Sequence, residues 1–367
     1  MPTAALLVAA LVLAAPAATG GAQLRAPQGF FGIAPQTALT PEDARYMKAG
    51  GIDTVRWPIF WTQVQPTAAA VYDWSAFDQT VEIAARAGLR VFPSLGPTPG
   101  WLARKETTLP VLTARQRRAW TAFVGAAVRR YGPGGEFWRV HSAPGVNYEP
   151  PLPRALPIRT WQIWNEANFF YFAYPVSPAR YAKLVTISSK AIKRVDPGAD
   201  VVLAGLFGEP TAAGKRGMPA SIFLEQLYSR SGFKSRFDAA ALHPYAVDAE
   251  TLAEMTEQMR QVMLDNHDPR AGLYITEMGW GSQNNFRQVA FEQGIRGQVR
   301  QLQDSYSYLL LNRKRLNLKG TFWYSWKDIR GSCDFCDSVG LFRQGAAFRP
   351  KPAWHAFVKI AGGRARP

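Results

Sequence analysis

Histidine and cysteine are scarce in this sequence, and their scarcity excludes several kinds of protein. The 367 residues include four histidines and two cysteines. The histidines are scattered, so the clustered His and Asp of a metal-dependent deacetylase or phosphodiesterase are missing. The cysteines, Cys333 and Cys336, form one CxxC that lacks the second half of a zinc site. We therefore expect no metal and no cofactor, and a short-loop disulfide between these two residues.

Acidic residues are also few, with 27 against 43 basic residues and a net charge of +16. Such a balance raises the question of nucleic-acid binding. The basic residues are dispersed, however, and the short patches at 115–118 and 312–315 fall on expected helices. Charge runs of this kind are typical of solvated helix faces, so we expect no nucleic-acid partner.

Long apolar runs are missing after the first residues, and a bilayer span needs about 20 of them. Residues 4–15 are uncharged and apolar and are followed by small residues, a pattern typical of a signal peptide, although no Lys or Arg precedes them. An N-terminal anchor or a mis-set start are the alternatives. We expect residues 1–22 to be a signal peptide and residues 23–367 to form one secreted domain, monomeric and without stable membrane insertion.

The rest of the chain alternates short apolar runs with amphipathic stretches, which is the pattern of βα units. About eight such pairs follow one another without a linker, the number that closes a barrel. The sequence therefore predicts an α/β fold, a single (β/α)8 TIM barrel, with long loops at 133–157 and 328–347. Strands are expected at 30–35, 53–61, 88–96, 159–168, 199–207, 237–245, 272–280 and 320–328.

Chemistry-bearing side chains end several of these apolar runs. In barrel enzymes the strand ends of the carboxyl-terminal face build the active site, so these residues are expected to converge on one cleft although they lie far apart in sequence. They are Arg56, Asn165, Glu166, His243, Tyr245, Glu277, Trp323 and Trp326.

Two of these residues, Glu166 and Glu277, are carboxylic acids, and glycosidic hydrolysis needs two. One must be protonated to donate to the leaving oxygen, and the other must be ionised to attack the anomeric carbon. A carboxylate at the end of an apolar strand is costly unless it is paired or used. Arg56 is expected to keep Glu277 charged, while an apolar and anionic setting raises the pKa of Glu166. For a retaining enzyme, the carboxyl groups should lie about 5–5.5 Å apart.

Two segments, WQIWNEAN at 161–168 and LYITEMGW at 273–280, resemble the strand-four and strand-seven motifs of clan A of the glycoside hydrolases. The likeness extends over nearly the whole chain after residue 22 and is nearest to families 39 and 5, where Pro usually stands at the position of Ala167. The resemblance implies that Glu166 is the general acid/base and Glu277 the nucleophile of a retaining hydrolase.

The same resemblance assigns supporting roles. Asn165 would hydrogen-bond the sugar 2-hydroxyl, and Arg56, His243 and Tyr245 would orient or polarise the nucleophile. Trp323 and Trp326 alternate in face, so at most one is expected to floor the sugar subsite, and we favour Trp326.

Other residues and activities compete with this interpretation. Trp61 and Trp101 either form further subsites or cap the rim of the barrel, and Glu209 and Asp328 are expected in plain turns. A catalytically weak carbohydrate-binding barrel would have lost a glutamate, and an aldolase or phosphate-binding isomerase would need a strand-end Lys or a Gly-rich loop. A transglycosidase would use the same residues. The expected partner is a polysaccharide or oligosaccharide, and the basic charge favours an anionic one.

Overall fold

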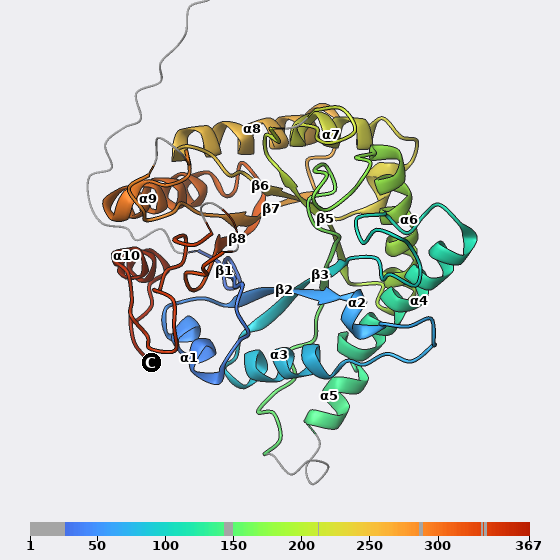
Figure 1. Ribbon diagram of the computed structural model, residues 1–367, viewed down its shortest axis with the longest axis horizontal. Coiled ribbons are helices and arrows are strands. Elements are labelled where there is room, and N and C mark those ends of the chain that lie inside the picture. The colour runs from blue at the N-terminus through green and yellow to red at the C-terminus, as the bar shows by residue number, and fades with distance from the viewer. Residues whose placement is uncertain (1–25, 143–149, 212, 286–288, 332, 334–335) are drawn as a thin grey trace, which may run out of the picture.

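The computed structural model describes residues 26–142, 150–211, 213–285, 289–331, 333 and 336–367. The expected signal peptide, residues 1–22, lies outside the described residues. Eight parallel strands close into a barrel in sequence order, and β1 pairs with β8. Helices surround the ring (Figure 1), so the predicted (β/α)8 barrel is confirmed. The strands are β1 (Phe31–Ala34), β2 (Thr54–Phe60), β3 (Arg90–Gly96), β4 (Thr160–Ile163), β5 (Asp200–Phe207), β6 (Ala239–His243), β7 (Gly272–Met278) and β8 (Leu318–Tyr324).

Several helices begin where the sequence supplies a side-chain cap. Thr40 and Thr113 each form a capping box with the residue three positions later, and Ser177 caps a helix that starts with Pro178. No described helix has the length and apolarity required to cross a membrane. The helices are α1 (Pro41–Ala49), α2 (Trp61–Val64), α3 (Ser75–Arg86), α4 (Ala114–Tyr131), α5 (Glu136–His141), α6 (Pro178–Val195), α7 (Ala220–Tyr228), the 3-10 turn η1 (Phe233–Arg236), α8 (Ala249–Asp265), α9 (Gly294–Asn312) and α10 (Pro352–Ala361).

Three expectations about element boundaries were wrong. Strand β4 ends at Ile163 and not at residue 168, so Asn165 and Glu166 follow it. The segment 133–157 is not all loop, because α5 forms within it and buries Phe137 and Trp138. Strand β8 ends at Tyr324 and not at residue 328, so Trp326 lies outside it. Gly and Pro around α5 masked its short apolar pattern, and the aromatic run of β8 continues past its last strand pairing.

The barrel interior has an apolar layer and a polar layer. Toward the amino-terminal ends of the strands, Phe92, Phe322 and Tyr274 pack against small side chains. Toward the carboxyl-terminal ends, charged and polar side chains replace them, among them Arg56 of β2 and His243 of β6. The apolar layer thus closes the barrel beneath the polar layer, which faces the cleft described next.

Candidate active site

A cleft of about 430 Å³ opens at the carboxyl-terminal ends of the strands. That volume is within the range of small-molecule sites. Segments from β1, β2, β3, β7 and β8 and the chain after β4 contribute to its wall. Its lining residues are Ala34, Pro35, Gln36, Arg56, Pro58, Phe60, Ser94, Leu95, Gly96, Pro97, Glu106, Thr107, Trp164, Asn165, Tyr171, Phe172, Glu277 and Tyr324.

Glu277, near the end of β7, has both carboxylate oxygens engaged. Arg56 donates from Nη1 to Oε1 at 2.5 Å, and the Tyr245 hydroxyl donates to Oε2 at 2.8 Å. The β7–β8 pairing is irregular between Ile275 and Met278. Side chains alternate in a regular strand, and irregular pairing re-aims them. This irregularity accounts for two consecutive side chains, Thr276 and Glu277, both reaching groups inside the barrel.

The surroundings of Glu277 favour its ionised form. Burial by itself raises the pKa of this carboxyl, whereas the Arg56 cation and the hydrogen bonds from Arg56 and the Tyr245 hydroxyl lower it, and the pKa lies below its usual range. Burial and the neighbouring Glu277 raise the pKa of Tyr245, so that the hydroxyl keeps its proton and remains a donor. A carboxylate held charged and aimed at a cleft is suited to act as a nucleophile.

Glu166 lies just beyond β4 on an unusual stretch of backbone. Its φ is 39° and that of Trp164 is 73°, both in the left-handed region that non-glycine residues seldom adopt. Asn168 stabilises this stretch, because its amide bonds the backbone N–H and C=O of Phe207 on β5 and the C=O of Met218. The second Asn of the WNEAN motif is therefore a support for the loop that the sequence analysis missed.

His243 bonds Glu166, at 2.7 Å between Nδ1 and Oε1, whereas its Nε2 lies 3.7 Å from Oε1 of Glu277. The resemblance implied that His243 orients or polarises the nucleophile; in the structure its hydrogen bond goes to Glu166, and it lies near Glu277 without a recorded hydrogen bond to it. Burial raises the pKa of Glu166 above its usual range; His243 and Arg56 oppose this shift, and Glu277 adds to it. Glu166 is thus the more easily protonated of the two carboxylates.

The two glutamates face the same small volume. One carboxylate oxygen of each, together with a ring nitrogen of His243, all lie within 4.8 Å of one another. Such a trio invites comparison with a metal site, but Arg56 already neutralises Glu277 and would repel a cation at that position. The set therefore fits two cooperating carboxyl groups better than metal ligands.

All three guanidinium nitrogens of Arg56 donate hydrogen bonds within this site. Besides Glu277 it donates from Nη2 to Oδ1 of Asn165 at 2.7 Å and from Nε to Oε1 of Gln162 at 2.7 Å. Because arginine only donates, these bonds fix both amide orientations. The Asn165 side chain lines the cleft, and its NH2 group, which has no recorded bond among the described residues, can donate to a ligand.

At most one of Trp323 and Trp326 was expected to floor the sugar subsite, and neither lines the cleft. Trp323 is fully buried and donates to the Val339 carbonyl, and Trp326 is 1% exposed and donates to Asp43. Tyr324 lies between them and lines the cleft instead. Side-chain alternation along β8 places it on the face opposite Trp323, but the sequence analysis applied this alternation to the two tryptophans alone.

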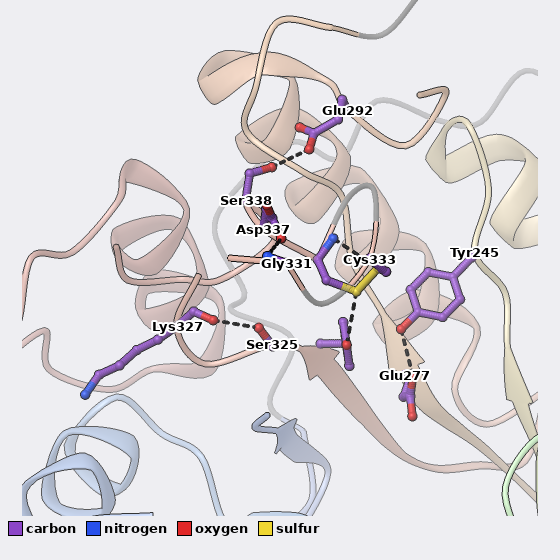
Figure 2. The surroundings of a disulfide bond; sticks show 11 residues. Tyr245, Glu277, Glu292, Ser325, Lys327, Gly331, Cys333, Asp337 and Ser338 are labelled. Atoms are coloured by element: carbon purple, nitrogen blue, oxygen red, sulfur yellow. Dashed lines mark hydrogen bonds between the residues drawn. A yellow bond between two sulfur atoms is a disulfide. The ribbon is translucent and has the colours of Figure 1, made fainter. Parts of the chain in front are cut away.

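The expected disulfide between Cys333 and Cys336 is present and lies beside the site. The sulfur of Cys336 is 3.2 Å from the Tyr324 hydroxyl, in a small apolar cluster that also contains Tyr245. Figure 2 shows Tyr245 next to this bridge with its hydroxyl directed at Glu277. The disulfide therefore supports one wall of the cleft.

The remaining candidates lie outside the cleft lining. Trp61 is fully buried and bonds Gln65, and Trp101 donates to the Gln65 carbonyl, so both are rim supports rather than subsites. Asp328 accepts bonds from Lys351 and the Gly340 N–H, as suits a structural turn. Glu209 is exposed beyond the end of β5.

Comparison with known proteins finds a match to one family model, described as Beta-galactosidase, over residues 35–130. That segment is about a quarter of the chain and contains Arg56 but neither glutamate. A comparison with curated proteins finds no match.

Solved structures share the fold. A family 39 glycoside hydrolase from Bacteroides cellulosilyticus WH2 superposes with a TM-score of 0.66 at 19% identity, covering 92% of this chain and 64% of its own length. A monomeric beta-xylosidase from Caulobacter crescentus CB15 superposes with a TM-score of 0.62 at 18% identity, covering 91% of this chain and 68% of its own length. A GH5_18 protein from Bifidobacterium longum subsp. infantis superposes with a TM-score of 0.64 at 15% identity, covering 93% of this chain and 80% of its own length. This chain thus spans less than two thirds of the Bacteroides protein.

Proposed function

We propose that this protein is a retaining glycoside hydrolase that cleaves O-glycosidic bonds by double displacement. The single observation that carries the proposal is a pair of buried glutamates, of which Glu277 lines the cleft, with oxygens within 4.8 Å and pKa values displaced in opposite directions. Two carboxyl groups this close suit retention, because inverting enzymes need roughly 6.5–9.5 Å to admit a water molecule.

The chemistry follows from the two environments. Glu277, kept ionised by Arg56 and Tyr245, attacks the anomeric carbon while Glu166 gives its proton to the leaving oxygen. The glycosyl group is then bonded to Glu277, and Glu166, now ionised, takes a proton from water. That water attacks the anomeric carbon and frees Glu277, so two inversions give net retention.

Asn165 and the aromatic rim indicate how a sugar is held. The NH2 group of Asn165 can donate to the hydroxyl next to the anomeric carbon. Phe60, Tyr171 and Phe172 line the cleft and are 41%, 66% and 40% exposed, which is high for large apolar side chains. Flat rings of this kind suit the C–H faces of sugars, so we propose an oligosaccharide or polysaccharide as substrate.

A screen of purified protein against aryl glycosides and a polysaccharide panel tests this function. The Glu277→Gln variant is the matched control, since it keeps the size of the side chain but loses the charge and one of the two accepting oxygens. We expect at least one glycoside to be hydrolysed by the wild type and not by E277Q. Equal rates for both proteins would mean that a contaminant or another site is responsible. Products extended by an added acceptor sugar would indicate transglycosylation instead.

We further propose that the protein is exported. A disulfide persists in oxidising compartments, and the Cys333–Cys336 bridge beside the cleft supports this location. Fusion of residues 1–22 to a reporter enzyme that is active only after export tests it. A reporter retained inside the cell would contradict it.

A further inference from the structure

A chain of buried hydrogen bonds connects the two glutamates on the side away from the cleft. It starts at Arg56, which holds Glu277 with Nη1 and donates from Nε to Oε1 of Gln162. Gln162, on β4, is fully buried. Because Arg56 has no acceptor atom, the atom of Gln162 that faces it must be the oxygen, and its NH2 group must point the other way.

The NH2 group of Gln162 has one partner for each hydrogen. It donates to the Leu203 carbonyl at 3.1 Å and to Oγ1 of Thr276 at 3.3 Å. Thr276 therefore accepts from Gln162, and its own hydroxyl hydrogen remains to be placed. The hydroxyl is fully buried, and a buried donor without a partner costs about 1–3 kcal/mol.

His243 provides the acceptor. Its Nε2 lies 3.0 Å from Oγ1 of Thr276, and no other acceptor for this hydroxyl is recorded among the described residues. If Thr276 donates to Nε2, that nitrogen carries no proton, so the proton of the neutral ring is on Nδ1. Nδ1 is the atom 2.7 Å from Glu166.

We propose that Gln162 and Thr276 are positioning residues that hold His243 as the neutral tautomer protonated on Nδ1, so that it donates a hydrogen bond to Glu166. The role of this donor in catalysis rests on the proposed function, but the tautomer does not. The donor stabilises the ionised carboxylate, which is the form that must accept a proton from water in the second half of the reaction.

The backbone leaves space for this row of hydrogen bonds. Gly205 of β5 lies against His243 and Thr276, and a Cβ atom at this position would collide with both side chains. The Gly205 carbonyl also accepts the N–H of Glu166 at 3.2 Å. A residue without a side chain therefore leaves room for the His243–Thr276 bond and anchors the strained backbone of Glu166 at the same place.

The charged and titratable groups around Glu166 come from three strands and one loop. They are Arg56 of β2, His243 of β6, Glu277 of β7 and Tyr245 after β6. Thr276 bonds only His243 among them, so changing Thr276 alters how His243 acts on Glu166 and leaves the recorded bonds of the other three in place.

The tautomer is measured directly by 15N NMR of the full-length protein labelled at histidine. Only four histidines are present, and the signals lost in a His243→Asn variant assign this ring. We expect a pyrrole-type Nδ1 and a pyridine-type Nε2 at neutral pH. A proton on Nε2 alone, or an imidazolium ring, would overturn the inference, whether or not the protein hydrolyses glycosides.

The catalytic consequence is tested with Thr276→Val, which keeps the shape and removes the hydroxyl, and with Thr276→Ser, which keeps the hydroxyl. With its donor to Nε2 gone, Nδ1–H is a weaker donor and the ionised form of Glu166 is less favoured. The alkaline limb of the kcat/KM profile should therefore move upward by roughly 0.5–1 pH unit in T276V and stay in place in T276S. Equal profiles for T276V and wild type would overturn the role of Thr276.

Discussion

Glu277 and Glu166 are almost equally buried at one mouth of the barrel, with 8% and 5% of their surfaces exposed, yet their partners differ in kind. Glu277 meets a permanent cation and a hydroxyl, Arg56 and Tyr245. Glu166 meets an imidazole and a strained backbone. The same side chain is thereby biased toward ionisation in one place and toward protonation in the other. Partners, rather than depth of burial, separate the two roles.

Removing the ionised member should have the largest effect. For Glu277→Ala we expect kcat to fall by roughly 10⁴-fold or more, because the substitution removes the carboxylate proposed to attack the anomeric carbon. Added azide should restore turnover and give a glycosyl azide of inverted configuration, which NMR of the product detects. Glu209→Ala is the matched control, since this exposed carboxylate should be dispensable. Failure of azide to rescue E277A would count against the nucleophile assignment.

Removing the protonated member should have an effect that depends on the substrate. Glu166→Ala should lower kcat/KM by roughly 10²–10⁴-fold for glycosides with poor leaving groups. Aryl glycosides whose phenol leaves readily should lose far less in the first step, because they need no proton. The ratio of the two losses across a series of phenols is the measurement. An equal loss across the series would contradict the role of an acid.

Removing a hydrogen-bond donor to Glu277 should reduce the difference in pKa between the two glutamates. The nucleophile must be ionised, so activity is lost as the pH falls through the Glu277 pKa, which lies below the ordinary 4.5. Tyr245→Phe removes a donor to this carboxylate and raises its pKa. The acidic limb of kcat/KM should move up by about one pH unit, while the alkaline limb, set by Glu166, stays nearly fixed. A shift of the alkaline limb alone would contradict the assignment of Tyr245 to Glu277.

The smallest effect is expected at the wall that supports Tyr324. Replacing Cys333 and Cys336 by Ser removes a bridge that closes a very short loop, which is worth about 2 kcal/mol in the chain-entropy model. We expect a modest fall in Tm and a rise in KM of a few fold, since Tyr324 lines the cleft. Unchanged KM would show that the bridge stabilises the loop without positioning Tyr324.

Much of the site was predictable because strand-end polar residues of a parallel barrel meet on one face. The apolar runs and caps located the strands, and Arg56, Asn165, Glu166 and Glu277 were found by that rule alone. Contacts set by backbone irregularity were not predictable. No sequence pattern announces the left-handed backbone of Glu166 or the irregular pairing that brings both Thr276 and Glu277 inward.

The differences from expectation have the same origin. His243 was expected to orient or polarise the nucleophile, and its hydrogen bond goes to Glu166, because which carboxylate a strand-end side chain contacts depends on register and twist rather than on order along the chain. Trp326 was expected on the cleft because β8 was extended beyond Tyr324. An aromatic run gives no sign of where strand pairing stops, so Tyr324 was overlooked between two more conspicuous tryptophans.

The stereochemistry of the first-formed product tests most directly whether both glutamates act on one anomeric centre. Hydrolysis of an active glycoside is followed by proton NMR from the earliest minutes, before the free sugar mutarotates. The account predicts that the sugar first appears with the same anomeric configuration as the substrate. The first appearance of the opposite anomer would contradict it, because a single displacement by water leaves Glu277 no role as a nucleophile.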